Sequence, residues 1–350
     1  MKLNYIILNY NKYIIFILNI IMTVINNLEI DALEFKRNEI KDAIRNNDPI
    51  EDKLHVIIVV SNPCLYAKRY LLANQFKKRM EEEQDIILYI VELAYGNQKY
   101  YITDENNKNH LRIQTDIPLW HKENMINIGV KKLLPNNWKA FAWIDSDIEF
   151  ENNTWAIDTL KILNGCKDIV QLFSHAVDLD NNEMTMSVFN SFGYQYIKKK
   201  IYCSTGINYW HPGYAWACTR KLYEKMGGLF ELSILGSGDH NMALSILNNG
   251  LKSVNKDATD NYKKIIIEFQ KKIRNARLGY VPGVIRHYYH GSKKNRKYTE
   301  RWKILVNNNF DPINHIDHDK NGIIIPSIKF PENLKKEIFM YFKERNEDDE

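Results

Sequence analysis

Short apolar runs alternate with helical patterns along most of the chain. The apolar runs are nearly continuous, which is typical of strands that are buried on both faces: Leu54–Val60, Ile86–Val91, Phe141–Ile144 and Ile169–Phe173. Between them lie segments with apolar residues at helical spacing: 65–83, 119–134 and 155–163. This alternation predicts βαβ units around a mostly parallel sheet. We therefore expect an α/β fold with a Rossmann-like sheet that is flanked by helices and binds its ligand at the carboxyl ends of the strands.

Three parts of the chain differ in pattern. We expect an N-terminal appendage over 1–53, one main domain over 54–305 and a helical tail over 306–350. In the appendage, the apolar segment 5–25 is interrupted by asparagines and a lysine. Its longest uninterrupted stretch is far shorter than the ~20 residues of a membrane-spanning helix. The segment is interpreted as a weak signal anchor, an interfacial helix or a plain extension, and residues 31–52 as a polar helix or linker.

Composition excludes several classes of protein. The chain has 350 residues, of which 45% are hydrophobic and 26% charged. These values are ordinary for globular proteins and exclude a disordered, collagen-like or polytopic membrane protein. A net charge of +5 over this length is too small to indicate nucleic acid as a partner.

The stretch Ile144-Asp145-Ser146-Asp147 is the most informative motif. Two carboxylates at the end of a buried strand are costly unless a cation compensates them. A divalent cation that is also bound by substrate phosphates meets this need. The alternative is a chance pair in a surface turn, and the apolar residues on both sides of the motif weigh against it.

A second motif combines glycines with an acid. Gly236-Ser237-Gly238-Asp239 is followed by residues 240–247, which have helical character. Glycines allow a ligand to approach the backbone closely, and Asp239 stands where a helix begins. Asp239 is therefore either an N-cap or a carboxylate that a helix N-terminus keeps ionised and available as a base.

Two histidines end the apolar run that begins at Val284. His287 and His290 are three residues apart, so in an extended segment they point to opposite faces. At most one then lies beside the carboxylates, unless the chain turns at Tyr289. Either one is a candidate metal ligand.

Aromatic residues are interleaved with Gly and Pro in the segment 210–216. Trp210, Tyr214 and Trp216 are either core residues or rings that stack on a sugar face. Gly238 and His240 flank the candidate base and belong to the same expected acceptor region.

These motifs, in this order, resemble the metal-dependent GT-A glycosyltransferases. In that family a strand ends in D-x-D, whose acids hold Mn²⁺ or Mg²⁺ against a nucleotide-sugar diphosphate; a later Gly-rich turn supplies the catalytic acid, and a histidine completes the metal shell. Val284-Ile285-Arg286-His287 resembles the M-I-R-H stretch of the β-1,4-galactosyltransferases. The glycines around Gly213 and Gly236, together with His287-x-x-His290-Gly291, are also similar to glycosyltransferase-like proteins of viruses and bacteria. The resemblance covers roughly residues 54–305.

The resemblance implies a GT-A-like domain that transfers a hexosyl group from a nucleotide-sugar to a hydroxyl of a glycan, protein or other acceptor. The donor is expected to be a UDP-sugar, and the configuration of the anomeric carbon is expected to be inverted. It also implies a role for each matched position. The metal ligands would be Asp145, Asp147, His287 and His290, and Asp239 would be the catalytic base. The donor contacts would be Ser61, Asn62, Lys122, Asn124, Asn127, Asp145 and Ser146. The Gly-rich turn has one acid where the galactosyltransferases have three, so the identities of donor and acceptor do not carry over.

Two other functions remain open. A metal-dependent nucleotidyl- or phosphotransferase would also use a D-x-D motif on a parallel sheet, although it more often has a Gly-rich phosphate loop after the first strand. A catalytically silent sugar-binding protein could keep the same fold. We expect a cytoplasmic location, in the host cell if the protein is viral; the alternative is membrane anchoring through residues 5–25.

Overall fold

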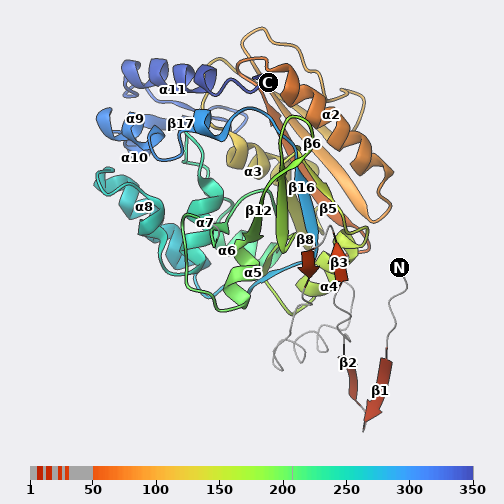
Figure 1. The fold of residues 1–350 in the computed structure, drawn as a ribbon. Helices are drawn as coiled ribbons and strands as arrows, with labels where there is room; N and C mark the ends of the chain where they lie inside the picture. Colours follow the sequence, from red (N-terminus) through yellow and green to blue (C-terminus); the bar gives the residue numbers. More distant parts are fainter. Residues whose placement is uncertain are drawn as a thin grey trace.

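A seven-stranded sheet forms the centre of the molecule (Figure 1). The structure is a computed structural model, which describes residues 6–10, 13–17, 23–25, 28–30, 50–206 and 208–349. In spatial order its strands are β15 (Leu278–Tyr280), β10 (Ile169–Gln171), β14 (Ala215–Thr219), β8 (Ala140–Ile144), β5 (Leu54–Ser61), β6 (Ile86–Tyr95) and β7 (His110–Thr115). Strand β14 is antiparallel to both of its neighbours, and the other adjacent pairs are parallel. The predicted α/β fold with a mostly parallel sheet flanked by helices is confirmed.

Helices cover both faces of this sheet, and each face has its own hydrophobic core. Ile57 of β5 packs in one core, whereas its neighbours Val56 and Ile58 pack in the other. This alternation explains why the sequence of β5 is apolar throughout. The first core also holds the apolar faces of α3 (Lys122–Leu133), α6 (Arg220–Met226), α7 (Gly238–Ile246) and α8 (Asp260–Ile273). The second holds those of α2 (Ala67–Glu82) and α4 (Trp155–Leu163).

A five-stranded sheet continues from the end of β8. In spatial order it contains β13 (Trp210–His211), β12 (Thr185–Ser191), β11 (His175–Leu179), β16 (Val284–His287) and β9 (Ile148–Phe150). Residues 145–147 connect β8 of the first sheet to β9 at the edge of the second. The D-x-D motif therefore lies where the two sheets meet.

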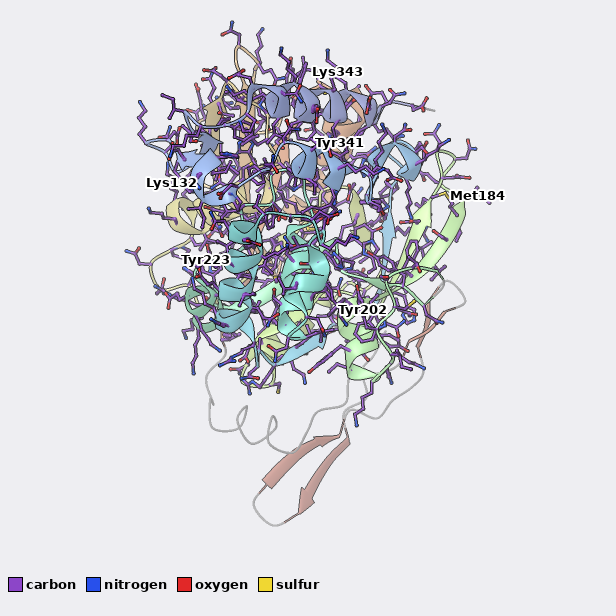
Figure 2. All side chains as sticks on the ribbon, turned by 90° about the vertical axis from the view of Figure 1, so that its left-hand side faces the viewer. Lys132, Met184, Tyr202, Tyr223, Tyr341 and Lys343 are labelled. Carbon is purple, nitrogen blue, oxygen red and sulfur yellow. The ribbon has the colours of Figure 1, made fainter. Side chains whose placement is uncertain are left out.

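The remaining elements of the main body are mostly helical. They are α5 (Phe192–Ile197), the 3₁₀ helices η1 (Gly250–Ser253) and η2 (Lys293–Arg296), α9 (Arg301–Asn307), α10 (Pro312–His315), β17 (Ile316–His318), β18 (Ile324–Pro326) and α11 (Glu332–Glu344). The expected helical tail thus also contains the antiparallel pair β17–β18. Leu334, Ile338 and Tyr341 of α11 pack in the first core. Figure 2 shows Tyr341 and Lys343 of this helix at one end of the molecule, with Tyr202 toward the other.

The described parts of the first 30 residues are two antiparallel strand pairs. They are β1 (Ile6–Tyr10) with β2 (Tyr13–Ile17), and β3 (Thr23–Ile25) with β4 (Leu28–Ile30). Residues 31–49, for which we expected a polar helix or linker, lie outside the described residues. None of the helices in the described ranges has the length and apolar character needed to cross a membrane.

Candidate active site

A cavity of about 890 Å³ lies at the carboxyl ends of the central strands. The chain runs from β5 outward to β6 and β7, then returns to place β8 on the other side of β5. Such a reversal of strand order is where open α/β sheets bind ligands. Ser61 at the end of β5 lines the cavity, as do Asp145 and Asp147 after β8 and Asp239 at the start of α7.

The register of the second sheet brings Asp147 to the two histidines. Strand β9 is antiparallel to β16 and pairs Ile148 with His287, so Asp147 lies next to the end of β16. The backbone N–H of Tyr288 donates to the carbonyl oxygen of Asp147 at 2.8 Å. Strand β16 ends at His287, and residues 288–290 belong to no helix or strand. Both imidazoles reach the same carboxylate, although the sequence pattern favoured at most one.

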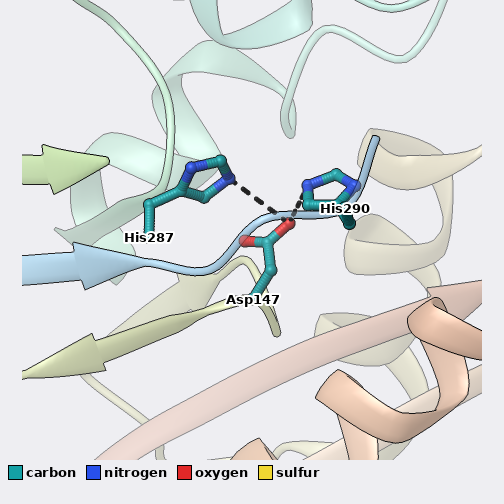
Figure 3. Close-up of side chains that lie close together, drawn as sticks. All are labelled: Asp147, His287 and His290. Carbon is teal, nitrogen blue, oxygen red and sulfur yellow. Dashed lines mark ion pairs between the residues drawn. The ribbon is translucent and has the colours of Figure 1, made fainter. Parts of the chain in front are cut away.

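Asp147, His287 and His290 form a compact group (Figure 3). Oδ2 of Asp147 lies 2.8 Å from Nε2 of His290 and 3.8 Å from Nε2 of His287. One ligand atom from each of the three residues lies within 4.8 Å of the other two. Burial would raise the pKa of Asp147, but the two histidines lower it well below its usual range.

Asp178 fixes the orientation of His287. It stands directly across from His287 in the pairing of β11 with β16, and its side chain is fully buried. Oδ1 accepts hydrogen bonds from Nδ1 of His287 and from the hydroxyl of Tyr214, both at 2.9 Å. Oδ2 is paired with Lys293. A carboxylate on the outer nitrogen of a histidine is a common second contact around metal ions, because it holds the ring and increases its basicity.

The three residues fit a divalent transition metal. They offer a carboxylate and two imidazoles, and Oδ1 of Asp147 is buried without a hydrogen-bond partner among the described residues. Imidazole suits transition metals, whereas Mg²⁺ prefers oxygen ligands in an octahedral shell. Asp147, His287 and His290 could therefore hold a divalent transition-metal ion.

Asp145, the other acid of the motif, has a different partner. Its Oδ1 lies 2.5 Å from Nζ of Lys122, which stands at the start of α3. Burial raises the pKa of Asp145, and the charge of Lys122 opposes this effect. Burial would lower the pKa of Lys122, but Asp145 and Asp239 raise it above its usual range. That Asp145 ligates the metal stays a prediction.

The N-terminus of α7 presents Asp239 to the cavity. The N-cap is Ser237, in the left-handed conformation with φ of 83°, and Asp239 lies in the first turn of the helix. Its Oδ1 accepts from the backbone N–H of His240 at 2.8 Å. A Cβ on Gly213 would come within 3.1 Å of Oδ2, so glycine at this position leaves room for the carboxylate. Asp239 is therefore not the N-cap, which was the structural alternative to a catalytic role.

A buried carboxyl that the sequence analysis missed lies behind this turn. Glu123 packs against Gly238 so closely that a Cβ there would come within 2.4 Å of its Cδ. Its Oε2 is buried without a hydrogen-bond partner among the described residues. Burial, with a further contribution from Asp239, raises the pKa of Glu123 to about 8 against the opposing effect of Lys122. Gly238 thus serves the packing of α7 on α3, because no larger residue fits there.

The structure brings only some of the other predicted residues to the cavity. Besides the acids and histidines, the predicted residues that line it are Ser61, Lys122, Ser146, Tyr214 and His240. The ring of Tyr214 stacks on His211, with centroids 4.2 Å apart and an interplanar angle of 10°. The ring of Tyr214 also lies beside that of His287, with centroids 4.7 Å apart.

Three predicted donor contacts are engaged elsewhere. The side chain of Asn62 hydrogen-bonds the backbone N–H and C=O of Tyr66 in the turn before α2. Asn124 donates to the carbonyl of Gly322, and Asn127 donates to the carbonyl of Leu229. These amides join segments of the fold and do not line the cavity.

The two tryptophans of the aromatic segment are core residues. Trp210 and Trp216 are 4% and 1% exposed and pack in the first hydrophobic core. Nε1 of Trp216 donates to the carbonyl of Pro212 at 2.8 Å. Neither ring lines the cavity.

The cavity has an excess of positive charge. Four carboxylates line it, those of Asp145, Asp147, Asp239 and Glu347. Seven cationic side chains do so: Arg69, Lys122, Lys252, Lys293, Arg296, Arg301 and Arg345. This balance suits a polyanionic ligand such as a diphosphate.

Two of these arginines are held by the C-terminal helix. The hydroxyl of Tyr341 accepts from Nη1 of Arg301 at 3.3 Å and donates to the carbonyl of Arg296 at 3.0 Å. Arg301 also donates to the hydroxyl of Ser237, the N-cap of α7. The guanidinium of Arg296 lies against the ring of His290, with Nη2 2.8 Å from Nε2. Helix α11 thereby supports the cavity both beside His290 and at the N-terminus of α7.

Comparison with known proteins gives structural likeness alone. No protein-family model and no curated protein matches the sequence. The catalytic domain of Drosophila beta-1,4-galactosyltransferase 7 with xylobiose is 11% identical; the match covers 80% of this chain and 96% of that chain, with a TM-score of 0.37. A mutant of that enzyme with manganese, UDP-Gal and xylobiose is 14% identical, with coverage of 57% and 62% and a TM-score of 0.33, so the match spans less than two thirds of that chain.

A third similar structure comes from another kind of enzyme. The 4-diphosphocytidyl-2C-methyl-D-erythritol synthase of Anaerococcus prevotii is 9% identical; the match covers 84% of this chain and 96% of that chain, with a TM-score of 0.32. A galactosyltransferase is thus among the structures to which this chain is similar, as is a synthase of a diphosphocytidyl compound. The argument for function therefore rests on the site of this chain.

Proposed function

We propose that this protein transfers a sugar from a nucleotide-sugar to a hydroxyl group of an acceptor, with a divalent cation bound by Asp147, His287 and His290. One observation carries the proposal. The metal-binding group and the carboxylate of Asp239 face the same cationic cavity at the carboxyl edge of the sheet. Glycosyl transfer needs both positive charge for a leaving diphosphate and a base for the attacking hydroxyl.

The donor would lie between Ser61 and the metal-binding group. A cation held by Asp147, His287 and His290 would supply positive charge to the leaving diphosphate. Lys122 and the arginines that line the cavity would bind the remaining phosphate oxygens, as charged donors do at other phosphate sites. A UDP-sugar is the expected donor.

Asp239 would act on the acceptor. As the hydroxyl oxygen bonds to the anomeric carbon, its proton passes to the carboxylate of Asp239 and the bond from that carbon to the diphosphate oxygen breaks. Attack from the side opposite the diphosphate inverts the configuration of the anomeric carbon. Tyr214 and His240 both line the cavity and would contact the acceptor sugar.

A product assay separates this reaction from the alternatives. The protein is incubated with Mn²⁺, a panel of nucleotide-sugars and simple glycosides, and the nucleotide products are identified. We expect release of nucleoside diphosphate that depends on acceptor and metal. In a parallel incubation with nucleoside triphosphates and sugar phosphates, release of pyrophosphate would indicate a nucleotidyltransferase instead. Donor-dependent thermal stabilisation without any product would indicate a silent sugar-binding protein.

A further inference from the structure

Two residues of the segment 345–349, which follows α11, line the cavity: Arg345 and Glu347. Glu347 is 1% exposed, although it stands in an acidic stretch of sequence that would be expected to be solvated. Its Oε1 accepts from Nη2 of Arg69 at 2.8 Å and from Nε of Arg345 at 2.6 Å. Its Oε2 is paired with Nε of Arg69. Two guanidinium groups therefore fix the position of this carboxylate.

Neighbouring residues anchor the same segment to the start of α2. The carboxylate of Asp348 accepts from the backbone N–H groups of Ala67 and Lys68 at 2.9 and 2.8 Å. The hydroxyl of Tyr66 accepts from the backbone N–H of Asn346 at 3.2 Å. The two bonds to Asp348 satisfy amides in the first turn of α2, which have no partner within the helix.

The segment also explains the glycine that follows His290. Gly291 has φ of +84°, and a Cβ on it would come within 2.8 Å of the carbonyl oxygen of Asn346 and 2.9 Å of Cα of Glu347. The backbone of the segment thus passes directly over Gly291. A side chain at position 291 would push it away from the neighbouring histidine.

Glu347 faces the outer nitrogen of His290 at ion-pair distance, and Asp178 is hydrogen-bonded to the corresponding nitrogen of His287. Oε2 of Glu347 lies 3.6 Å from Nδ1 of His290, and Oδ1 of Asp178 lies 2.9 Å from Nδ1 of His287. Both rings turn their Nε2 atoms toward Oδ2 of Asp147. We infer that Glu347 is a positioning residue of the metal site, which orients His290 for the cation. This inference rests on the metal site of the proposed function.

Metal affinity of the full chain tests the inference, with Mn²⁺ alone as the probe in titration calorimetry. Loss of an outer carboxylate weakens metal binding by about 10–100-fold in comparable sites, and we expect Glu347→Gln to do the same. Asp349→Ala, two residues away on the exposed part of the segment, should leave the affinity unchanged. Gly291→Ala should also weaken binding, because it displaces the segment without changing a charge or a ligand.

A double-mutant cycle separates positioning from simple electrostatics. If Glu347 acts through His290, Glu347→Gln should have no further effect on Mn²⁺ affinity in a His290→Ala background. An equal loss in both backgrounds would overturn the inference, because the carboxylate would then act only by its charge. Unchanged affinity in Glu347→Gln would also overturn it and leave the proposed function intact. If the parent protein binds no Mn²⁺, the proposed metal site fails as well. Should Glu347→Gln not fold, Gly291→Ala decides the question.

Discussion

The two ends of the cavity use their carboxylates in opposite ways. At the metal end, Asp147 faces two imidazoles, and the outer nitrogen of each ring faces another buried carboxylate, that of Asp178 or Glu347. At the other end, Asp145 is paired with Lys122, and Asp239 contacts the backbone of its own helix. The side chains of the Lys122–Asp145 pair are 18% and 27% exposed, whereas those of the two histidines are 5% and 7% exposed.

This difference indicates which end is fixed before a ligand arrives. At the metal end, the buried carboxylates of Asp178 and Glu347 orient the two histidines, so the ligand geometry is already formed before the cation binds. The other end consists of the Lys122–Asp145 ion pair and the carboxylate of Asp239, whose present contacts an incoming phosphate or hydroxyl can replace. The cation thus binds at the rigid end, and the reacting groups of the substrate contact the adaptable end.

The strongest test removes the shared carboxylate at the metal end. Asp147→Ala should abolish measurable Mn²⁺ binding and Mn²⁺-dependent donor binding, because both histidines lose the ligand between them. Titration calorimetry measures both affinities. Asp145→Ala is the matched variant and should keep the metal, since Asp145 is paired with Lys122. An equal loss in Asp145→Ala would place that residue in the metal shell, as the sequence pattern implies, and would remove the difference between the two ends.

The next test addresses the adaptable end. Asp239→Asn keeps the size of the side chain but removes its capacity to accept a proton, so turnover should fall by roughly 10²–10⁴-fold. Mn²⁺ and donor affinities should stay at the parent values. Turnover is measured as release of nucleoside diphosphate under saturating donor. Near-normal turnover would exclude Asp239 as the base, and loss of donor binding would make it part of the donor site.

A smaller effect on Mn²⁺ affinity is expected when Asp178, which contacts the outer nitrogen of His287, is changed. Asp178→Asn weakens the hold on His287 and should lower Mn²⁺ affinity by about 10–100-fold. Tyr214→Phe removes another hydrogen bond to Asp178 but leaves the bond to His287, so its effect on Mn²⁺ affinity should be smaller. Equal affinities in Asp178→Asn and the parent would show that the orientation of His287 does not depend on this carboxylate.

The smallest effect concerns stability and pH. Folding raises the pKa of Glu123 from 4.5 to about 8, so unfolding releases its proton between these values and stability falls as the pH rises through this range. Glu123→Gln removes this contribution. The melting temperature of the variant, measured from pH 5 to 8, should fall less than that of the parent. Glu268→Gln, an exposed change on α8, should retain the parent slope, and an identical slope in Glu123→Gln would contradict the assignment.

Sequence periodicity predicted the elements whose buried residues form a strong local pattern. Strand β5 and helix α4 lie where the apolar patterns placed them, because burial on a sheet or against it leaves a strong pattern. The edge strand β7 was missed, since His110, Arg112 and Gln114 alternate with apolar residues over only six positions. The β11–β12 pair was missed for a related reason, because Thr185 and Met186 begin β12 on the exposed surface.

The site was predictable only where its residues stand in a local pattern. Asp147 and the histidines end apolar runs and were recognised. Asp178 interrupts an apolar strand, which is a usable signal, but only the register of β11 against β16 brings it to His287. Trp210 and Trp216 could not be distinguished as core or platform, because aromatic residues in a segment that also contains Gly and Pro are compatible with either.

The place of β16 in the second sheet has a consequence for synthesis on the ribosome. This strand lies between β11 and β9, both of which precede it in the sequence by more than a hundred residues. A nascent chain that has not yet reached β16 therefore carries β11 with one unpaired edge, β9 without a partner strand among the described residues, and an Asp178 without its histidine, an arrangement that disfavours burial. The second sheet closes only when Val284–His287 inserts between them. The emerging chain would thus be most exposed to faulty strand pairing in the interval before this insertion.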